Sequence, residues 1–304
     1  MNHLLKMLDL SSKEIDELLN LADQLKYEQK HGMIHPVLDG RTLAMIFQKP
    51  STRTRVSFEV GMLQLGGHSI FLSAEDMQLG RGEPTEDTAR VLSRYCDAIM
   101  MRTYEQSEIE ELAHFGTIPV INGLSDFAHP CQVLADLMTI REFKGSLDGL
   151  KVAFIGDGNN MMNSTIVGCL KMRMNVAVAC PEGYNPAPEV LDYAAQVGHF
   201  EMYRDPRGAA RGADVVITDV WASMGMEDEE QQRLLDFRGF TVSAEVMRYA
   251  KPGAMVLHGL PARRGEEITA EILEEHSAEI FEEAENRLHV QKAVLVKLIA
   301  PAHA

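Results

Sequence analysis

Hydrophobic and polar positions along this chain follow two periods, one typical of strands and one typical of helices. In the first half, short apolar runs predict strands, and apolar residues spaced three and four positions apart predict helices between them. The expected strands are residues 42–47, 68–72, 97–101 and 117–121, and the expected helices are residues 11–31, 52–65, 84–95 and 105–114. Ser11 and Glu14 form a capping box at the first helix. This alternation predicts a parallel sheet covered by helices.

A polar, glycine-rich segment, Lys144 to Gly149, separates this half from a second series of the same kind. Strands are expected there at residues 151–155, 175–180, 200–203, 214–218, 254–258 and 279–281, and a last helix is expected from Phe281 to about Ile299. We therefore predict an α/β protein of two Rossmann-like domains, each a parallel sheet flanked by helices. The expected division is residues 1–146, residues 147–285 and a C-terminal helix at residues 286–304.

Composition limits the classes of function. The chain has 304 residues, of which 45% are hydrophobic and 24% are charged, as is typical of a soluble globular protein. Neither a membrane span nor a signal peptide is expected, and four cysteines without metal-site spacing indicate reduced thiols in the cytoplasm. A net charge of −16 disfavours nucleic acid and anionic membranes as partners. An anionic small molecule would therefore be held by local arginines.

The turn between the first two expected elements of the sheet, Ser51-Thr52-Arg53-Thr54-Arg55, is rich in groups that bind anions. Three hydroxyls and two arginines stand at a helix N-terminus, where N–H groups and the helix dipole favour a phosphate or a carboxylate. The alternative is an ordinary N-cap at Ser51 or Thr52 with solvated arginines.

Two further groups follow strands. Arg102 comes directly after the expected strand 97–101, and His129 and Gln132 flank Pro130, which fits the first turn of a helix. Ligands of open α/β sheets bind at the carboxyl ends of the strands, so these side chains point toward a site. The alternatives are a solvated arginine and a structural histidine.

The segment from Gly156 to Asn160 starts with a G-x-G pattern after a strand, which suggests a dinucleotide site, and Glu182 lies at a suitable distance for a ribose contact. Met161 occupies the place of the third glycine, which weakens the interpretation as a nicotinamide dehydrogenase. Later in this half, Asp219 at a strand end can orient a cationic amine, and Ser223 can bind a carboxylate.

These motifs resemble those of the aspartate and ornithine carbamoyltransferases, and the resemblance covers nearly the whole chain. The matching segments are Ser51 to Arg55, His129 to Gln132, Ser223 to Gly225 and His258 to Pro261. Ser223-Met224-Gly225 resembles the closing loop of the ornithine branch rather than the aspartate branch. The resemblance implies transfer of the carbamoyl group of carbamoyl phosphate to the side-chain amine of L-ornithine, giving L-citrulline and phosphate, without a cofactor or metal.

The resemblance also implies the site residues. Contacts to carbamoyl phosphate are expected from Ser51, Thr52, Arg53, Thr54, Gln78, Arg102, His129, Gln132, Gly259, Leu260 and Arg287. Catalytic roles fall to Thr54, Arg102, His129 and Gly259, and contacts to ornithine to Asn160, Asp219, Ser223 and Met224. In the family, the loop that matches Gln78 reaches a neighbouring subunit's active site, which implies a homotrimer with shared sites. The last helix, with Arg287 in its first turn, returns to the first domain in the family.

One position departs from the family pattern. Gly259 stands where ornithine carbamoyltransferases usually have a cysteine beside the reacting groups. A weakly active or non-catalytic homologue is therefore one alternative. A carbamoyltransferase for another amine, such as putrescine, is a second, although it would not need an α-carboxylate site of the Ser223 kind.

Overall fold

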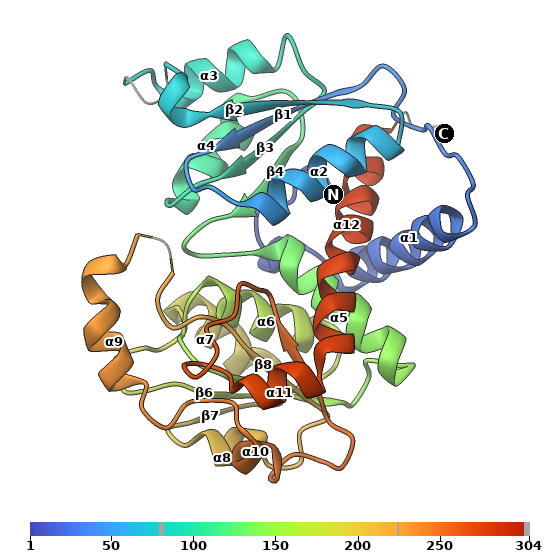
Figure 1. Ribbon diagram of the computed structural model, residues 1–304. Coiled ribbons are helices and arrows are strands. Elements are labelled where there is room, and N and C mark those ends of the chain that lie inside the picture. The colour runs from blue at the N-terminus through green and yellow to red at the C-terminus, as the bar shows by residue number, and fades with distance from the viewer. Residues whose placement is uncertain (79–81, 224, 301–304) are drawn as a thin grey trace. The chain divides into compact units, whose positions relative to one another are not determined.

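The computed structural model describes residues 1–78, 82–223 and 225–300. The chain divides into two compact units, each built on its own parallel sheet (Figure 1). Unit 1 contains Met1–Leu134 and Arg287–Ala304, and unit 2 contains Ala135–Asn286. The predicted class, α/β with two parallel sheets and flanking helices, is confirmed.

The sheet of unit 1 has the strand order β2-β1-β3-β4, with all neighbouring strands parallel. Its strands are β1 (Thr42–Phe47), β2 (His68–Ser73), β3 (Ala98–Arg102) and β4 (Val120–Leu124). Its helical segments are η1 (Met7–Asp9), α1 (Ser12–Lys30), α2 (Thr52–Gln64), η2 (Ala74–Asp76), α3 (Thr85–Leu92) and α4 (Gln106–Phe115). The capping box expected at the first helix is present, since Ser11 and Glu14 each bind the other's backbone N–H.

The sheet of unit 2 has the order β7-β6-β5-β8-β9, again with parallel neighbours. Its strands are β5 (Lys151–Ile155), β6 (Asn175–Ala179), β7 (Phe200–Tyr203), β8 (Val215–Thr218) and β9 (Met255–His258). Its helical segments are α6 (Asn160–Lys171), α7 (Pro188–Val197), α8 (Pro206–Ala210), η4 (Glu227–Glu229), α9 (Glu230–Asp236), α10 (Ala244–Met247) and α11 (Ala270–Glu275). The strand order reverses beside β5, so the ends of β5 and β8 mark the position where sheets of this type bind ligands.

Two helices belong to both units. The division between the units falls inside α5 (Pro130–Lys144), after Leu134, and inside α12 (Ser277–Ile299), after Asn286. The first turn of α5 and the second half of α12 therefore belong to unit 1.

Most expected elements lie within a few residues of the observed ones, but the strand expected at residues 279–281 is wrong. These residues lie in α12. Burial in this helix recurs at Ile280, Glu283, Arg287 and Val290, which is a helical period. Two of these four buried side chains are charged, so the apolar pattern predicted the helix only from Phe281 onward and missed its first turn.

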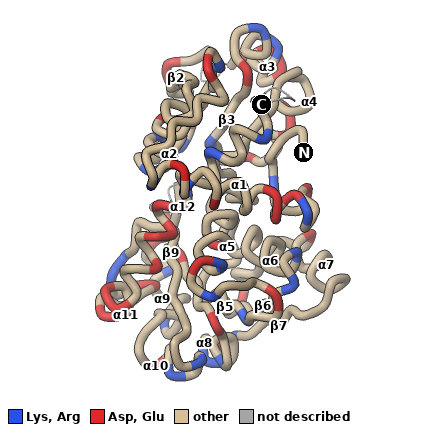
Figure 2. The backbone as a smooth tube through the Cα atoms, turned by 90° about the vertical axis from the view of Figure 1, so that its right-hand side faces the viewer, with Lys and Arg blue, Asp and Glu red and all other residues tan. Residues whose placement is uncertain are grey.

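Alternate strand residues carry the core of each unit. In unit 1, Ala44 and Ile46 of β1 and Ile99 and Met101 of β3 pack in one apolar cluster with residues of α3 and α4. Charged residues lie mainly on helices and loops, and Figure 2 shows the acidic positions of α11 in red. None of the helices in the described part of the chain is long and apolar enough to cross a membrane.

Candidate active site

The turn between β1 and α2 presents a helix N-terminus with three hydroxyl groups. Ser51 is the N-cap of α2: its Oγ accepts a hydrogen bond from the Thr54 backbone N–H at 3.2 Å and donates one to Thr54 Oγ1 at 3.1 Å. Thr52 and Arg53, the first two helical residues, are exposed. N–H groups of the first helical turn and the helix dipole favour an anion at this position. The N-cap bond uses the Ser51 Oγ and the Thr54 N–H, so other N–H groups of this turn can bind an anion at the same time.

Arg287 of α12 reaches this turn. Its Nη2 donates a hydrogen bond to Thr54 Oγ1 at 2.9 Å, and both side chains are buried. The structure thus brings Arg287 to Thr54, although 233 positions separate the two residues in the sequence.

Arg102 and His129 lie in unit 1, on segments that leave the carboxyl ends of β3 and β4. Arg102 is the last residue of β3, His129 immediately precedes α5, and both are buried. Burial lowers the pKa of His129 well below its usual range, and the charges of Arg287 and Arg102 act in the same direction. The imidazole is therefore neutral near pH 7 and can donate one N–H hydrogen bond. Two guanidinium groups around a neutral imidazole suit the stabilisation of a developing oxyanion.

The two glutamines expected at the site have different surroundings. Gln132 is buried in the first turn of α5, three residues after His129. Gln78 is exposed on the segment after β2, where its backbone carbonyl accepts a hydrogen bond from the Glu83 N–H at 3.0 Å. Residues 79–81, which follow Gln78 in the expected loop, lie outside the described residues. A contact from Gln78 to the phosphate stays a prediction.

Lys49 is a residue that sequence reasoning missed. It is buried, forms an ion pair with Asp126, and places its Nζ 4.2 Å from the centroid of the Tyr104 ring. These residues follow β1, β4 and β3, and backbone bonds join the same segments, from Gln48 N–H to Arg102 O and from Asp126 N–H to Tyr104 O, both at 2.8 Å. Lys49 thereby fixes the segments that carry the anion-binding groups. No short-range pattern in the sequence indicates this ion pair.

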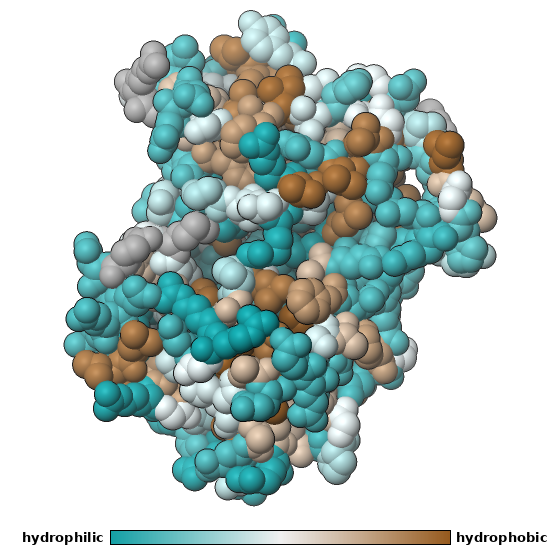
Figure 3. Space-filling view, viewed as in Figure 1, coloured by the Kyte–Doolittle hydropathy of each residue, from teal (hydrophilic) through white to brown (hydrophobic). Residues whose placement is uncertain are grey.

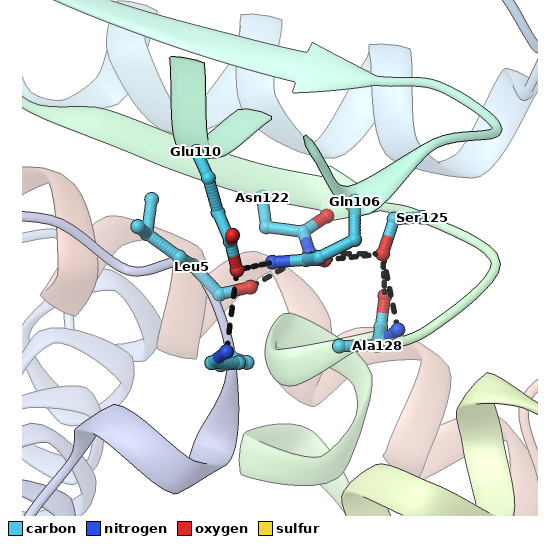
Figure 4. A network of polar contacts seen from close by, with 7 residues as sticks. Leu5, Gln106, Glu110, Asn122, Ser125 and Ala128 are labelled. Carbon is cyan, nitrogen blue, oxygen red and sulfur yellow. Dashed lines mark hydrogen bonds and ion pairs between the residues drawn. The ribbon is translucent and has the colours of Figure 1, made fainter. Parts of the chain in front are cut away.

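A polar network holds the loop that precedes His129, as Figure 4 shows. Ser125 Oγ donates to Gln106 Oε1 at 2.6 Å and accepts from the Ala128 N–H at 3.0 Å. The side-chain amide of Asn122 donates to the Leu5 carbonyl at 2.7 Å and to Gln106 Oε1 at 3.2 Å. Because buried polar groups rigidify a segment when they are satisfied, this network sets the direction in which the chain enters α5.

In unit 2, Asp219 follows β8. Part of the residue reaches the surface, yet protein surrounds its carboxyl group closely enough that desolvation raises the pKa of Asp219 to about 6. The carboxylates of Glu267 and Asp157 act in the same direction. The group is therefore largely ionised at pH 7, as a partner for an amine must be, but it becomes neutral in mild acid.

The turn after β9 is fixed by the side chain of His258. Its Nδ1 accepts a hydrogen bond from the Leu260 N–H at 2.9 Å, so its Nε2 carries the proton and donates to Glu267 Oε1 at 2.8 Å. Both ring nitrogens are thus occupied by the protein, which suits a structural rather than a proton-transferring role. Leu260 has a φ of 52°, a strained conformation for a residue with a Cβ. Gly259 lies between His258 and Leu260 in this turn. The contact of His258 with Glu267 was not predicted from the sequence.

The turn after β5 does not suit a dinucleotide. A Cβ at Gly158 would lie 2.2 Å from the backbone carbon of Asn185 and 2.4 Å from the nitrogen of Pro186, and the Gly158 N–H donates to the Tyr184 carbonyl at 3.1 Å. In dinucleotide sites this glycine lets the pyrophosphate approach the backbone. Here the chain's own backbone takes that place, which explains the glycine and argues against a nicotinamide dehydrogenase.

The remaining residues expected to bind the amino acid lie in unit 2. Asn160 is buried as the first residue of α6, while the preceding residue, Asn159, is the N-cap and accepts from the Met161 N–H at 3.0 Å. Ser223 is partly exposed on the segment after β8. Met224 lies outside the described residues.

Arg233 of α9, also missed by sequence reasoning, joins two of these segments. Its Nη1 donates to Asp157 Oδ2 at 2.7 Å and to the Trp221 carbonyl at 2.9 Å, while its Nε donates to Glu229 Oε2 at 2.9 Å. The turn that leads to Asn160 and the segment that leads to Ser223 are therefore held by one buried guanidinium. Among residues 1–78, 82–223 and 225–300, no cluster of three His, Cys, Asp or Glu side chains could hold a metal ion.

Comparisons with known proteins agree with this arrangement. Residues 2–142 match the family model described as the carbamoyl-P binding domain of aspartate/ornithine carbamoyltransferase. Residues 148–298 match the model described as the Asp/Orn binding domain of the same family.

Similar proteins cover nearly the whole chain. An ornithine carbamoyltransferase of Carboxydothermus hydrogenoformans is 54% identical over 300 residues, which are 97% of this chain and 96% of that protein. The solved structure of the ornithine carbamoyltransferase from Pyrococcus furiosus has a TM-score of 0.93 and 52% identity, covering 98% of this chain and 97% of that one. The anabolic ornithine carbamoyltransferase from Campylobacter jejuni has a TM-score of 0.93 and 43% identity, covering 98% and 99%. This chain therefore belongs to the aspartate/ornithine carbamoyltransferase family.

Proposed function

We propose that this protein transfers the carbamoyl group of carbamoyl phosphate to the side-chain amine of L-ornithine, giving L-citrulline and phosphate. The observation that carries the proposal is the convergence of Arg102, His129 and Arg287 with the capped turn of α2 in unit 1. Two cations, a neutral imidazole and a helix N-terminus fit a substrate with a phosphate and a carbonyl group. Similarity to ornithine carbamoyltransferases over nearly the whole chain supports the same reaction.

The anion-binding groups have distinct parts in this proposal. Ser51, Thr52 and Arg53, with the N–H groups of α2, bind the phosphate, and Gln132 and Gln78 add contacts to carbamoyl phosphate. Thr54, Arg102 and His129 stabilise the carbonyl oxygen as it becomes negative. Arg287 holds Thr54 and contributes charge.

The neutral amine attacks the carbonyl carbon directly, so that a C–N bond forms, the C–O bond to phosphate breaks, and the proton lost by the amine leaves with the phosphate. No covalent intermediate with the enzyme is needed, and positioning together with preorganised charge lowers the barrier. Asp219 holds the amino-acid substrate through an amine, Ser223 binds the α-carboxylate, and Asn160 and Met224 complete the contacts. The backbone of Gly259 and Leu260 lines the reacting carbonyl group.

A citrulline assay tests the proposal. Purified protein should convert carbamoyl phosphate and L-ornithine to citrulline, and putrescine should be a much poorer acceptor because it has no carboxylate for Ser223. Faster turnover of putrescine than of ornithine would favour the carbamoyltransferase for another amine. Absence of any carbamoyl transfer, in a folded protein, would favour the non-catalytic homologue that the replacement at Gly259 suggests.

The proposed domains are residues 1–146 for carbamoyl phosphate, residues 147–285 for ornithine, and residues 286–304 as a helix that returns to the first domain. The change of family model between residues 142 and 148 supports the first boundary. We also place the protein in the cytoplasm, since all four cysteines are free. Two similar proteins are named anabolic, which supports a role in arginine biosynthesis.

We propose that the protein is a homotrimer with shared active sites. An exposed apolar surface on unit 1 supports this assembly: Val56 and Leu63 of α2 and Ile70 and Phe71 of the edge strand β2 are 37–72% exposed. Figure 3 shows hydrophobic side chains in brown over these elements. Such a surface indicates a protein partner. Native mass spectrometry should find three times the chain mass of 33.8 kDa.

A further inference from the structure

Two buried carboxyl groups in unit 2 bind each other. Asp136 of α5 is 2% exposed and Glu283 of α12 is 1% exposed, and their side chains form a hydrogen bond. Two carboxylates cannot form such a bond without a proton, because neither can donate. One proton is therefore shared between these two residues, as in other carboxyl pairs that occupy one site.

The surroundings of the pair favour the proton. Burial raises the pKa of Glu283 well above its usual value, and Asp136, from α5, adds the next largest effect. Asp219, which follows β8, acts in the same direction, whereas the His258 N–H, at the end of β9, favours the ionised form. Beside Asp136 lies Cys169 of α6, whose thiol pKa is raised by burial and by the Asp136 charge, so this thiol stays neutral. The charged groups that act most strongly on Glu283 are thus carboxylates.

Glu283 connects this pair to the turn after β9. Its Oε2 accepts a hydrogen bond from the His258 backbone N–H at 2.9 Å. The His258 ring then holds the Leu260 N–H and Glu267, and Glu267 Oε1 also accepts from the Arg263 N–H at 2.7 Å. Glu283 is the first member of this chain of hydrogen bonds.

We propose that Glu283 is a positioning residue for carbamoyl transfer, and that the proton it shares with Asp136 keeps the turn of His258, Gly259 and Leu260 in place. The proposal rests on the proposed function, which assigns Gly259 and Leu260 to the reacting carbonyl group. Glu283 itself touches no substrate and acts through the backbone of His258.

The proton shared by Asp136 and Glu283 is lost as the pH rises. Folding raises the pKa of Glu283, so the protonated group stabilises the folded protein when the pH is below the ordinary pKa of 4.5. This contribution to stability is lost as the pH rises through the pKa of the folded protein. Once both groups are ionised, Asp136 and Glu283 repel each other. The bond to His258 should then weaken, and the turn should become more mobile as the pH rises.

An amide at position 283 tests the effect of the shared proton while it keeps the two hydrogen bonds. In Glu283→Gln the side-chain carbonyl can accept from the His258 N–H while the NH₂ group donates to Asp136, so that both bonds persist without a shared proton. Glu283→Ala removes both bonds and leaves a buried N–H unpaired. Glu275→Gln, the same chemical change at an exposed position of α11, is the matched control.

Two measurements on the full-length protein test the proposal. The first is the pH profile of kcat and of KM for ornithine. Glu283→Gln should keep kcat within about twofold of the wild type on the acid side of the wild-type profile and lose the decline of kcat with rising pH, whereas Glu283→Ala should lower kcat roughly tenfold because an unpaired buried group displaces the turn. The control should reproduce the wild-type profile.

The second measurement is hydrogen exchange of a peptide covering residues 257–265, corrected for intrinsic exchange. Exchange should be faster in Glu283→Ala, and it should rise with pH in the wild type but not in Glu283→Gln. Wild-type pH dependence in Glu283→Gln, or unchanged exchange in a folded Glu283→Ala protein, would overturn the proposal. If the wild type makes no citrulline, the proposed function fails on its own, and the exchange measurement still decides whether the shared proton holds the turn.

Discussion

Arg287 donates a hydrogen bond to the hydroxyl of Thr54 at 2.9 Å, although 233 positions separate the two residues. The bond joins the capped turn of α2 to α12. It also holds a buried guanidinium whose charge lowers the pKa of His129. Unit 1 therefore needs the last helix of the chain as well as its first half, and its anion-binding groups come from both of these parts.

The first prediction concerns this bond. Thr54→Val keeps the shape of the side chain but removes the oxygen that accepts from Arg287, so kcat/KM for carbamoyl phosphate should fall at least about tenfold. A double-mutant cycle with Arg287→Ala should give a coupling of about 0.5–3 kcal/mol between the two positions. Steady-state kinetics measures both. Thr117→Val, at an exposed threonine, is the control, and strictly additive effects would show that the bond has no part in binding.

The second prediction concerns Arg102. Arg102→Ala should lower kcat/KM by at least about a hundredfold, because a preorganised cation is lost from the developing oxyanion. Arg53→Ala should have a comparable effect through the phosphate. The pKa of His129 should also rise in Arg102→Ala, since the Arg102 charge lowers it in the native protein.

Kinetic assays and an NMR titration of the imidazole check these changes separately. Arg94→Ala, an exposed arginine of the same unit, should change neither quantity. Near-normal turnover in either Arg102→Ala or Arg53→Ala would remove that residue from the site.

The third prediction follows from Asp219. Its pKa is raised to about 6 by burial, so the carboxylate is present above that pH and lost below it. We expect kcat/KM for ornithine to fall with an acid limb near pH 6, whereas binding of carbamoyl phosphate should lack this limb. Asp219→Asn should lower kcat/KM for ornithine at all pH values, by about a hundredfold, and abolish the limb. An acid limb that persists in Asp219→Asn would assign it to another group, and Asp228→Asn is the exposed control.

Local chemistry explains which parts of the site could be predicted from the sequence. The cap at Ser51, the arginine at the end of β3 and the start of α5 at Pro130 depend on residues close in sequence, and the structure has each of them. The parallel sheets follow from the alternation of apolar runs and helical patterns in the same way.

Pairs that join distant segments could not be predicted. Lys49 with Asp126 and Asp136 with Glu283 involve charged residues that resemble solvent-facing positions, and only the fold buries them. The false strand at residues 279–281 has the same origin, since the buried face of α12 includes Glu283 and Arg287. The periodicity of apolar residues reveals the later turns of α12, but it does not show where the helix begins, because the buried face is partly ionic there.

The fourth prediction tests the shared active site. A chain with Arg102→Ala and a chain with Gln78→Ala should each have low activity alone, and mixed trimers should regain activity because some sites receive both intact residues. Activity should be measured after the chains are unfolded and refolded together, with native mass spectrometry to show that mixed trimers are present. A mixture of separately folded trimers is the control. Mixed trimers without recovery would mean that Gln78 acts within its own subunit or not at all.

The last prediction concerns Gly259, where the resemblance to ornithine carbamoyltransferases leads us to expect a cysteine. The anion-binding groups of unit 1 do not depend on that thiol, so the protein should make citrulline with lowered activity. The bonds of His258 to Glu283 and of Leu260 to His258 fix the backbone on both sides of Gly259, so a substitution there changes the side chain more than the turn. Gly259→Cys should then improve catalysis by about 1–3 kcal/mol of transition-state stabilisation, roughly ten- to a hundredfold.

Gly259→Ser and Gly259→Ala are the matched controls, because they add similar volume without a thiol. If the thiol itself improves the placement of the ornithine amine, only the cysteine variant should gain activity, and the gain should disappear when the thiol is alkylated. Weaker binding of ornithine and slower turnover in all three variants would show the opposite, namely that the neighbouring residues have adapted to glycine. The pocket around Gly259 would then be shaped for its second substrate by the absence of a side chain, and a missing thiol would not limit the reaction.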